Sequence, residues 1–120
     1  DLGSARGEFL FQLIKQAPHI RYCGLDNSLF RTWVARLKAW AFGKKAIFLH
    51  KDIFNANLSD ADVVYVYLPQ DLMPNLEIKL QKELKPESII ITNRVSFPSW
   101  EPAASYDLTK SEKLFLYVKN

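Results

Sequence analysis

The sequence has a single cysteine, Cys23, among its 120 residues. No internal disulfide can form, and one thiol supplies too little sulfur for a structural zinc site. The two histidines, His19 and His50, have no partners at ligand spacing, so no metal site is predicted. The sequence also lacks an apolar run long enough to cross a bilayer and a signal-peptide pattern. These features favour a cytoplasmic location and no membrane segment in this chain, with membrane attachment through an upstream segment left open.

The sequence also lacks a strong excess of charge of one sign. Sixteen basic residues stand against thirteen acidic ones, giving a formal net charge of +3. The basic residues are spread along the chain without interleaved aromatic residues, so a nucleic-acid surface is not indicated. With 48% apolar and 24% charged residues, the composition is that of a globular protein, and the length supports one domain over residues 1–120.

Apolar runs alternate with amphipathic stretches along the chain. Strands are predicted at residues 20–25, 46–49, 63–68 and 88–95, and an antiparallel hairpin at 106–109 and 114–119. Helices are predicted at residues 8–16, from 29 to the stop at Gly43, and 71–85. This order predicts an α/β fold, a Rossmann-like doubly wound and mostly parallel sheet with a C-terminal antiparallel hairpin. The runs 63–68 and 88–95 lack polar alternation, which is typical of strands buried on both faces.

The first seven residues, DLGSARG, have the pattern of a strand end followed by a glycine turn. A strand normally has five or six residues, so the first strand is expected to be largely missing and the domain N-terminally incomplete. It would be a central strand, and its loss removes backbone partners from the sheet. We expect a version extended upstream to melt at a higher temperature than this chain.

Three acids follow three successive predicted strands: Asp1, Asp26 and Asp52. Ligands of such sheets bind beyond the carboxyl ends of the strands, where these side chains would converge. Asp26 lies nineteen residues after Gly7, about the spacing at which a dinucleotide fold places an acid on a ribose diol. Three acids would repel a pyrophosphate, but they suit a nucleoside with an ammonium group and a cationic centre. S-adenosyl-L-methionine has all three features.

The glycines support the same ligand. Gly3 and Gly7 form G-x-x-x-G, which differs from the G-x-G-x-x-G of nicotinamide and flavin sites. Such a turn lets the backbone approach a ligand, and the helix N-terminus beyond it attracts a carboxylate. Each feature also has a structural explanation: a simple strand-to-helix turn for the glycines, a helix cap for Asp26 beside Asn27, and a solvated loop acid for Asp52. Their joint occurrence at successive strand ends favours the binding site.

The chain resembles the class I, seven-stranded methyltransferases that use S-adenosylmethionine, over its whole length. Residues 1–7 are similar to their first motif, D-x-G-x-G-x-G, with Ala5 in place of the middle glycine. Residues 24–26 resemble the segment whose acid holds the ribose hydroxyls, and residues 51–54 the segment that contacts the adenine. The resemblance implies that the donor is held by Asp1, Gly3, Ser4, Gly7, Asp26, Asn27, Asp52 and Ile53. Ala5 implies an altered fit to the ligand.

Within that superfamily, residues 61–68, the leucine-rich helix ending at Pro86, and the segments 92–94 and 97–100 resemble a narrower group. These are small protein-lysine methyltransferases related to the mitochondrial ATP-synthase c-subunit lysine methyltransferase and to archaeal lysine methyltransferases. The resemblance implies that a protein lysine side chain is the methyl acceptor.

Four residues near the ends of the later strands are candidates for the acceptor side. Tyr67 and Leu68 are predicted to form the wall beside the methyl group, with Tyr67 in position to exchange a hydrogen bond with the amine. Asn93 and Trp100 are candidates for substrate contact. A core tyrosine and a packing lid over the sheet end are the structural alternatives for Tyr67 and Trp100. Other functions left open are methyl transfer to a small molecule or RNA, a nucleotide-binding Rossmann module, and an inactive fragment.

Overall fold

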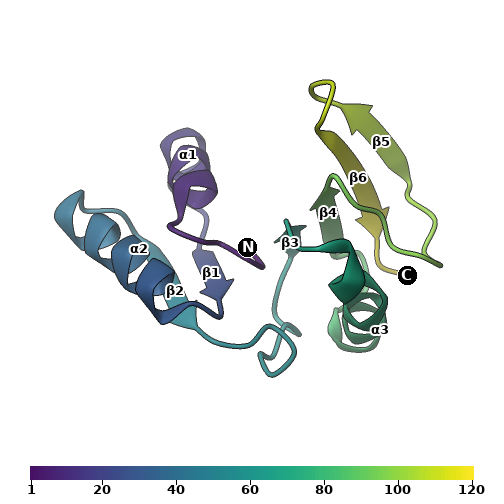
Figure 1. Ribbon diagram of the computed structural model, residues 1–120, viewed down its shortest axis with the longest axis horizontal. Helices are drawn as coiled ribbons and strands as arrows, with labels where there is room; N and C mark the ends of the chain where they lie inside the picture. The colour runs from purple at the N-terminus through teal and green to yellow at the C-terminus, as the bar shows by residue number, and fades with distance from the viewer. The chain divides into compact units, whose positions relative to one another are not determined.

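The computed structural model describes all residues from 1 to 120, and the chain divides into two compact units (Figure 1). Unit 1 is Asp1–Ala56 and unit 2 is Asn57–Asn120. Unit 1 contains α1 (Glu8–Gln16), β1 (Tyr22–Asp26), α2 (Leu29–Ala41) and β2 (Ala46–His50). Unit 2 contains β3 (Val63–Val66), the 3-10 helix η1 (Gln70–Leu72), α3 (Met73–Glu83), β4 (Ile89–Asn93), β5 (Ala104–Asp107) and β6 (Lys113–Val118). A single domain over residues 1–120 stays a prediction.

The sheet of unit 1 is a parallel pair in which Gly24 of β1 lies opposite Phe48 of β2. Leu2 forms an isolated parallel bridge with Leu25, so the backbone before the glycine turn runs beside β1 as the sequence predicted. Phe48 is the centre of the core, because buried residues of both helices pack with it, Leu10 from α1 and Ala35 from α2. The two helices therefore share one hydrophobic core on the Phe48 side of the sheet.

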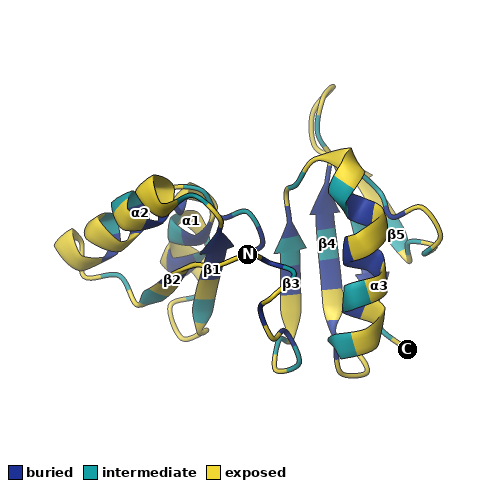
Figure 2. Ribbon diagram, turned by 60° about the horizontal axis from the view of Figure 1, so that its bottom comes forward, coloured by how far each residue is buried: buried dark blue, intermediate teal, exposed yellow.

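Helix α2 begins as the sequence predicted. The Ser28 hydroxyl accepts a hydrogen bond from the Arg31 amide at 3.3 Å and caps the first turn. The side of α2 that packs on the sheet consists of small residues, Thr32, Ala35 and Ala39. Its large apolar residues lie on the outer side and are exposed (Figure 2).

Unit 2 is a four-stranded sheet in the order β3-β4-β6-β5. The pair β3–β4 is parallel, and β6 runs antiparallel to both β4 and β5, which confirms the predicted hairpin. Helix α3 begins after η1 and ends at Glu83, within the predicted range. Leu76, Leu80 and Leu84 of its leucine stripe are buried.

Two details of the strand predictions were wrong. Strand β3 ends at Val66, so Tyr67 and Leu68 lie beyond it, and β3 and β4 are not buried on both faces (Figure 2). Val63 is 57% exposed while its neighbour Val64 is 3% exposed, and β4 begins with the same alternation. An unbroken apolar run shows that a strand has apolar side chains on both faces, but which face is buried depends on the helices that pack against the sheet.

None of the helices combines the length and the apolar character that crossing a membrane requires. No three His, Cys, Asp or Glu side chains gather closely enough to hold a metal ion.

Candidate donor site and acceptor residues

The glycine turn of unit 1 is fixed to the end of β1 by backbone hydrogen bonds. The amides of Gly3 and Ser4 both donate to the Leu25 carbonyl, at 2.8 and 3.0 Å. Gly3 and Gly7 have φ angles of 81° and 85°, in the left-handed region that favours glycine. Helix α1 starts directly after Gly7, so the turn presents the first amides of that helix beside the carboxyl end of β1.

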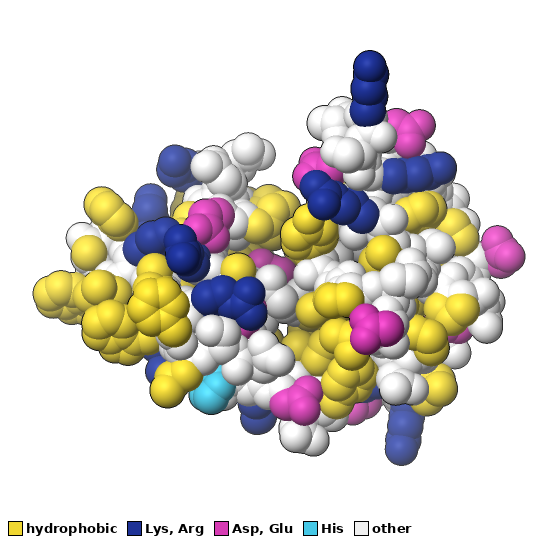
Figure 3. All heavy atoms as spheres, viewed as in Figure 1, with side chains coloured by type: hydrophobic (Ala, Val, Ile, Leu, Met, Phe, Trp, Pro, Cys, Tyr) yellow, Lys and Arg dark blue, Asp and Glu magenta, His cyan; other side chains and the backbone are white.

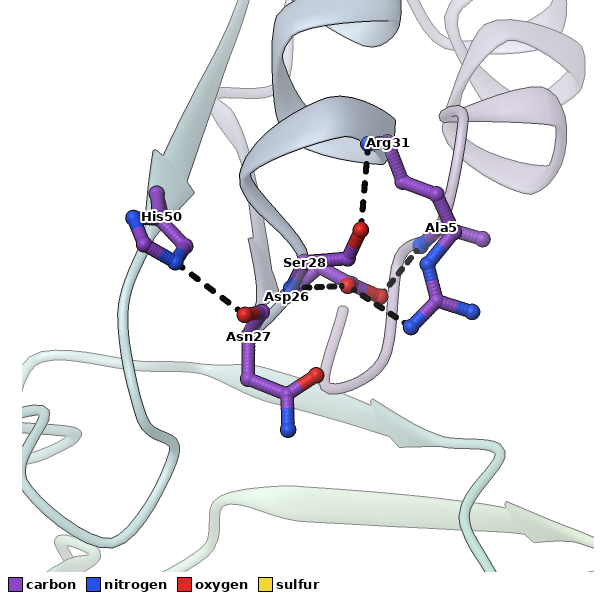
Figure 4. A network of polar contacts seen from close by, with 6 residues as sticks. All are labelled: Ala5, Asp26, Asn27, Ser28, Arg31 and His50. Atoms are coloured by element: carbon purple, nitrogen blue, oxygen red, sulfur yellow. Dashed lines mark hydrogen bonds and ion pairs between the residues drawn. The ribbon is translucent and has the colours of Figure 1, made fainter.

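Asp26, the last residue of β1, is the most strongly held acid of the site (Figure 4). Its Oδ2 accepts the Ala5 amide at 3.0 Å, and its Oδ1 accepts the Ser28 amide at 2.8 Å. The Arg31 guanidinium lies 3.1 Å from the same Oδ1. The side chain is 5% exposed. Asp26 therefore links the glycine turn to the start of α2. It lies at the predicted position at the strand end and also bonds to the first residues of the helix, as the helix-cap alternative requires.

Asp1 also belongs to this turn. Its backbone carbonyl accepts the Leu25 amide at 2.9 Å, and its carboxylate Oδ1 is buried without a hydrogen-bond partner. A buried acceptor without a donor is unfavourable, so a polar ligand atom or a water molecule is the expected partner of this oxygen.

Gly7 has a packing role within unit 1. A Cβ atom built on Gly7 would lie 2.7 Å from Cζ of Phe48. The missing side chain therefore makes room for the central aromatic ring of unit 1. Gly24 has the same role, because its Cβ would lie 2.7 Å from both the Phe48 ring and Ser4.

Ala5, at the position of the middle glycine, has a φ angle of 51°. An L-residue in this region costs about 1–2 kcal/mol, which a glycine would relieve. Glycine also has the greater conformational entropy in the unfolded state, so part of the stability gained by relieving the strain is lost again. We expect Ala5→Gly to stabilise unit 1 by about 0.5–1 kcal/mol, measured by urea unfolding. Ala17→Gly, at a position with φ of −137°, is the control and should not stabilise. Equal stability changes in the two variants would contradict strain at Ala5.

Asp52 and Ile53 follow β2, whose last residue, His50, lies opposite Asp26 in the sheet. The Asp52 carboxylate is exposed and accepts the Phe54 amide at 3.0 Å, while the Ile53 side chain is buried. Asn27 is exposed, and its carbonyl lies 3.1 Å from Nε2 of His50 (Figure 4). The ends of β1 and β2 are thus adjacent, with Asp26 turned inward and Asp52 open to solvent.

Tyr67 and Leu68 lie just beyond the end of β3 in unit 2. Tyr67 is 44% exposed, which excludes the alternative of a core tyrosine. The guanidinium of Arg94 lies 5.4 Å from the centre of its ring, so the residues after β3 and β4 are in contact. Arg94 itself has a φ angle of 73° and a second partner in Glu112 at 3.6 Å.

Asn93, the last residue of β4, is buried and donates through Nδ2 to the Tyr65 hydroxyl at 3.0 Å. Its Oδ1 has no hydrogen-bond partner. Burial raises the pKa of the Tyr65 hydroxyl, and the hydrogen bond from Asn93 opposes that rise. The pattern of the sequence did not single out Tyr65, although its spacing of two residues from Tyr67 within the predicted strand 63–68 was a signal that they share a face.

Trp100 lies in an aromatic cluster of unit 2. Its ring is 5.8 Å from Phe97 and 5.5 Å from Tyr117, between ring centroids. The loop is held further by the Ser99 amide, which donates to the buried carboxylate of Glu77 at 3.1 Å. Trp100 is half-buried, so this packing covers most of its surface and leaves the rest exposed.

The fold is that of the Rossmann-like methyltransferases. A crystal structure of an RNA methyltransferase from Salinibacter ruber, in complex with S-adenosyl-L-homocysteine, superimposes with a TM-score of 0.91 over 98% of this chain and 77% of that chain, at 24% identity. The chain belongs to the family described as the ANTKMT methyltransferase domain, whose model matches residues 1–104.

Two curated relatives agree with this family. The adenine nucleotide translocase lysine N-methyltransferase of Mus musculus is 33% identical over 87% of this chain and 46% of its own length. The ATP synthase c-subunit lysine N-methyltransferase of Xenopus laevis is 29% identical over 85% of this chain and 45% of its own length. The chain thus spans about half the length of the curated relatives it matches.

Proposed function

We propose that this chain carries the donor-binding part of an S-adenosyl-L-methionine-dependent methyltransferase that modifies a protein lysine side chain. The observation on which the proposal depends is the buried carboxylate of Asp26, which is bonded to the glycine turn at the end of β1. The names of the two curated relatives support lysine as the acceptor. The expected location remains cytoplasmic.

The residues of unit 1 fit this donor in two respects. Asp1 Oδ1 is a buried acceptor without a partner, which suits the ammonium group or a hydroxyl of the ligand. A carboxylate has about four acceptor positions, and the three donors around Asp26 leave one on Oδ2. One ribose hydroxyl can therefore bond to Asp26 directly, whereas the second competes with Arg31 for Oδ1. Gly3, Ser4, Gly7, Asn27, Asp52 and Ile53 complete the proposed contacts.

Arg31 is then a competitor of the ligand. Its side chain is 46% exposed, so its ion pair with Asp26 contributes little to stability. We expect Arg31→Ala to bind S-adenosylhomocysteine about twofold to fivefold more tightly, because Asp26 Oδ1 becomes available to the ribose at a cost of under about 1 kcal/mol. Lys38→Ala, which removes the other ion pair of α2, is the control. Weaker binding by Arg31→Ala in calorimetric titration would show that Arg31 supports the ligand instead.

The acceptor side is assigned to unit 2. S-adenosylmethionine supplies an electrophilic methyl group, and an incoming lysine amine must be neutral to receive it. Apolar surroundings lower the pKa of an amine and favour the neutral form. We assign the wall of this environment to Tyr67 and Leu68, and hydrogen bonding of the amine to the unpartnered Oδ1 of Asn93. Part of the Trp100 ring is assigned to the substrate channel. These groups align the nucleophile and require no metal.

Two measurements test the proposal. Calorimetric titration of the chain with S-adenosylhomocysteine should give saturable binding, and titration with NAD should give none. Binding of NAD alone would favour a nucleotide-binding Rossmann module. The second measurement follows a labelled methyl group from S-adenosylmethionine into a cell extract. Label recovered as methyl-lysine after protein hydrolysis supports the proposed acceptor. Label in RNA or small molecules would favour those acceptors, and donor binding without transfer would favour an inactive fragment.

A further inference from the structure

The outer side of α2 carries an apolar surface that has no partner within unit 1. It consists of five helix residues and one residue just beyond the helix, which together we call the α2 outer face: Leu29, Phe30, Trp33, Leu37, Trp40 and Phe42. Their exposed fractions run from 49% for Leu37 to 82% for Trp40. Figure 3 shows hydrophobic side chains gathered over α2, with Lys and Arg side chains and an acidic side chain beside them. Four exposed aromatic rings present on the order of 600 Å², more than the few hundred Å² of an ordinary apolar surface patch.

The arrangement around the helix is regular. At 3.6 residues per turn, the five helix residues of the α2 outer face occupy an arc of about 100°. The buried residues Thr32, Ala35 and Ala39 lie on the other side of the helix, against the sheet. Small residues thus serve the core, while the largest apolar residues of the helix face outward. Packing inside unit 1 does not explain why tryptophan occupies the exposed positions 33 and 40.

The charged residues of α2 and of the segment that follows it are all basic. Residues 29–45 contain five Lys or Arg residues and no Asp or Glu. With sixteen basic residues in the chain, eleven remain elsewhere against all thirteen acids. Arg36 borders the apolar arc on one side, and Lys44 and Lys45 follow the helix; none of the three forms an ion pair of the chain. Arg31 and Lys38 lie on the far side of the helix, where they pair with Asp26 and Glu8.

We propose that the α2 outer face docks on the surface of an anionic lipid bilayer. Tryptophan and phenylalanine prefer the boundary between head groups and acyl chains, and basic residues beside them reach the lipid phosphates. Apolar residues alone would suffice for a protein partner, whereas the basic residues Arg36, Lys44 and Lys45, which form no ion pair of the chain, match a surface that is uniformly negative. The helix lies along the interface and does not cross the bilayer. This inference does not depend on the proposed methyl transfer.

The test is co-sedimentation of the full chain with vesicles of phosphatidylcholine containing about 30% phosphatidylserine, with pure phosphatidylcholine vesicles as the reference. The chain should pellet with the anionic vesicles, less so at high salt, and its tryptophan fluorescence should shift to shorter wavelength. Trp40→Gln should lower the partition coefficient by about tenfold or more. Lys44→Glu with Lys45→Glu should abolish the preference for anionic vesicles.

The matched control is Ile78→Gln, which removes a residue that is 67% exposed on α3 and should leave vesicle binding unchanged. Circular dichroism verifies that each variant is folded. Failure of the unaltered chain to pellet, or equal binding by Trp40→Gln, overturns the proposal. Sedimentation velocity reports on the other occupant: a dimer that Trp40→Gln dissociates, without vesicle binding, would make this face a contact between copies of the chain and also overturn the proposal.

Discussion

Replacing Asp26 with alanine is expected to abolish binding of S-adenosylhomocysteine, with a loss of about 100-fold or more in affinity, and to destabilise unit 1 by about 2–3 kcal/mol. Both effects have one cause. The carboxylate accepts the amides of Ala5 and Ser28, and alanine leaves both donors without an acceptor. Calorimetric titration measures the affinity, and urea unfolding followed by circular dichroism measures the stability.

Two further variants separate binding from folding. Asp26→Asn retains one oxygen that can accept a backbone amide, so it should fold better than the alanine variant while it still binds the ligand about tenfold more weakly or worse. Asp60→Ala removes an exposed acid that forms no ion pair of the chain and should change neither quantity. Unaltered affinity in a folded Asp26→Asn variant would remove the ribose assignment and leave Asp26 with its capping role alone.

The second large effect is expected at Gly7. An alanine Cβ would lie 2.7 Å from Cζ and 2.9 Å from Cε1 of Phe48, and the backbone there has a φ angle of 85°. Steric conflict with the central core ring adds to the backbone strain, so Gly7→Ala should lower the free energy of unfolding by about 2–4 kcal/mol. The displaced turn should also weaken donor binding.

Gly43 provides a matched control, because it has a φ angle of 64° and nothing within 4 Å of a built Cβ. Gly43→Ala should therefore cost only the strain of the left-handed conformation, about 1 kcal/mol. The difference between the two variants in urea unfolding isolates the contact with Phe48. A Gly7→Ala variant no less stable than Gly43→Ala would contradict the packing role of Gly7.

Local patterns were sufficient for the helices and the hairpin. Helix α1 occupies the predicted residues 8–16, because a glycine turn before it and a solvated acid in its first turn set its start locally. Ser28 caps α2 as its position in the sequence indicated, and the hairpin strands pair antiparallel. These features depend on neighbours within a few residues, so the sequence contains the necessary information.

The site was only partly predictable. The placement of Asp26 at the end of β1, beside the glycine turn, followed from the alternation of elements. Its ion pair with Arg31 did not, because a salt bridge depends on the side-chain directions of a folded helix start. Asn93 was identified by position, whereas its bond to Tyr65 required the register of β3 against β4.

The sequence by itself determined the order of strands and helices, the acids at the strand ends and the departure from glycine at Ala5. These are matters of local propensity and periodicity. Only the tertiary structure decided which apolar residues are covered. Thr32, Ala35 and Ala39 form the packed side of α2 while Trp33 and Trp40 face outward, because the close approach of α2 to the sheet at Phe48 admits only small side chains. Whether a residue is buried depends on both surfaces that pack together, here α2 and the sheet, whereas the hydrophobic pattern of a helix describes only the helix.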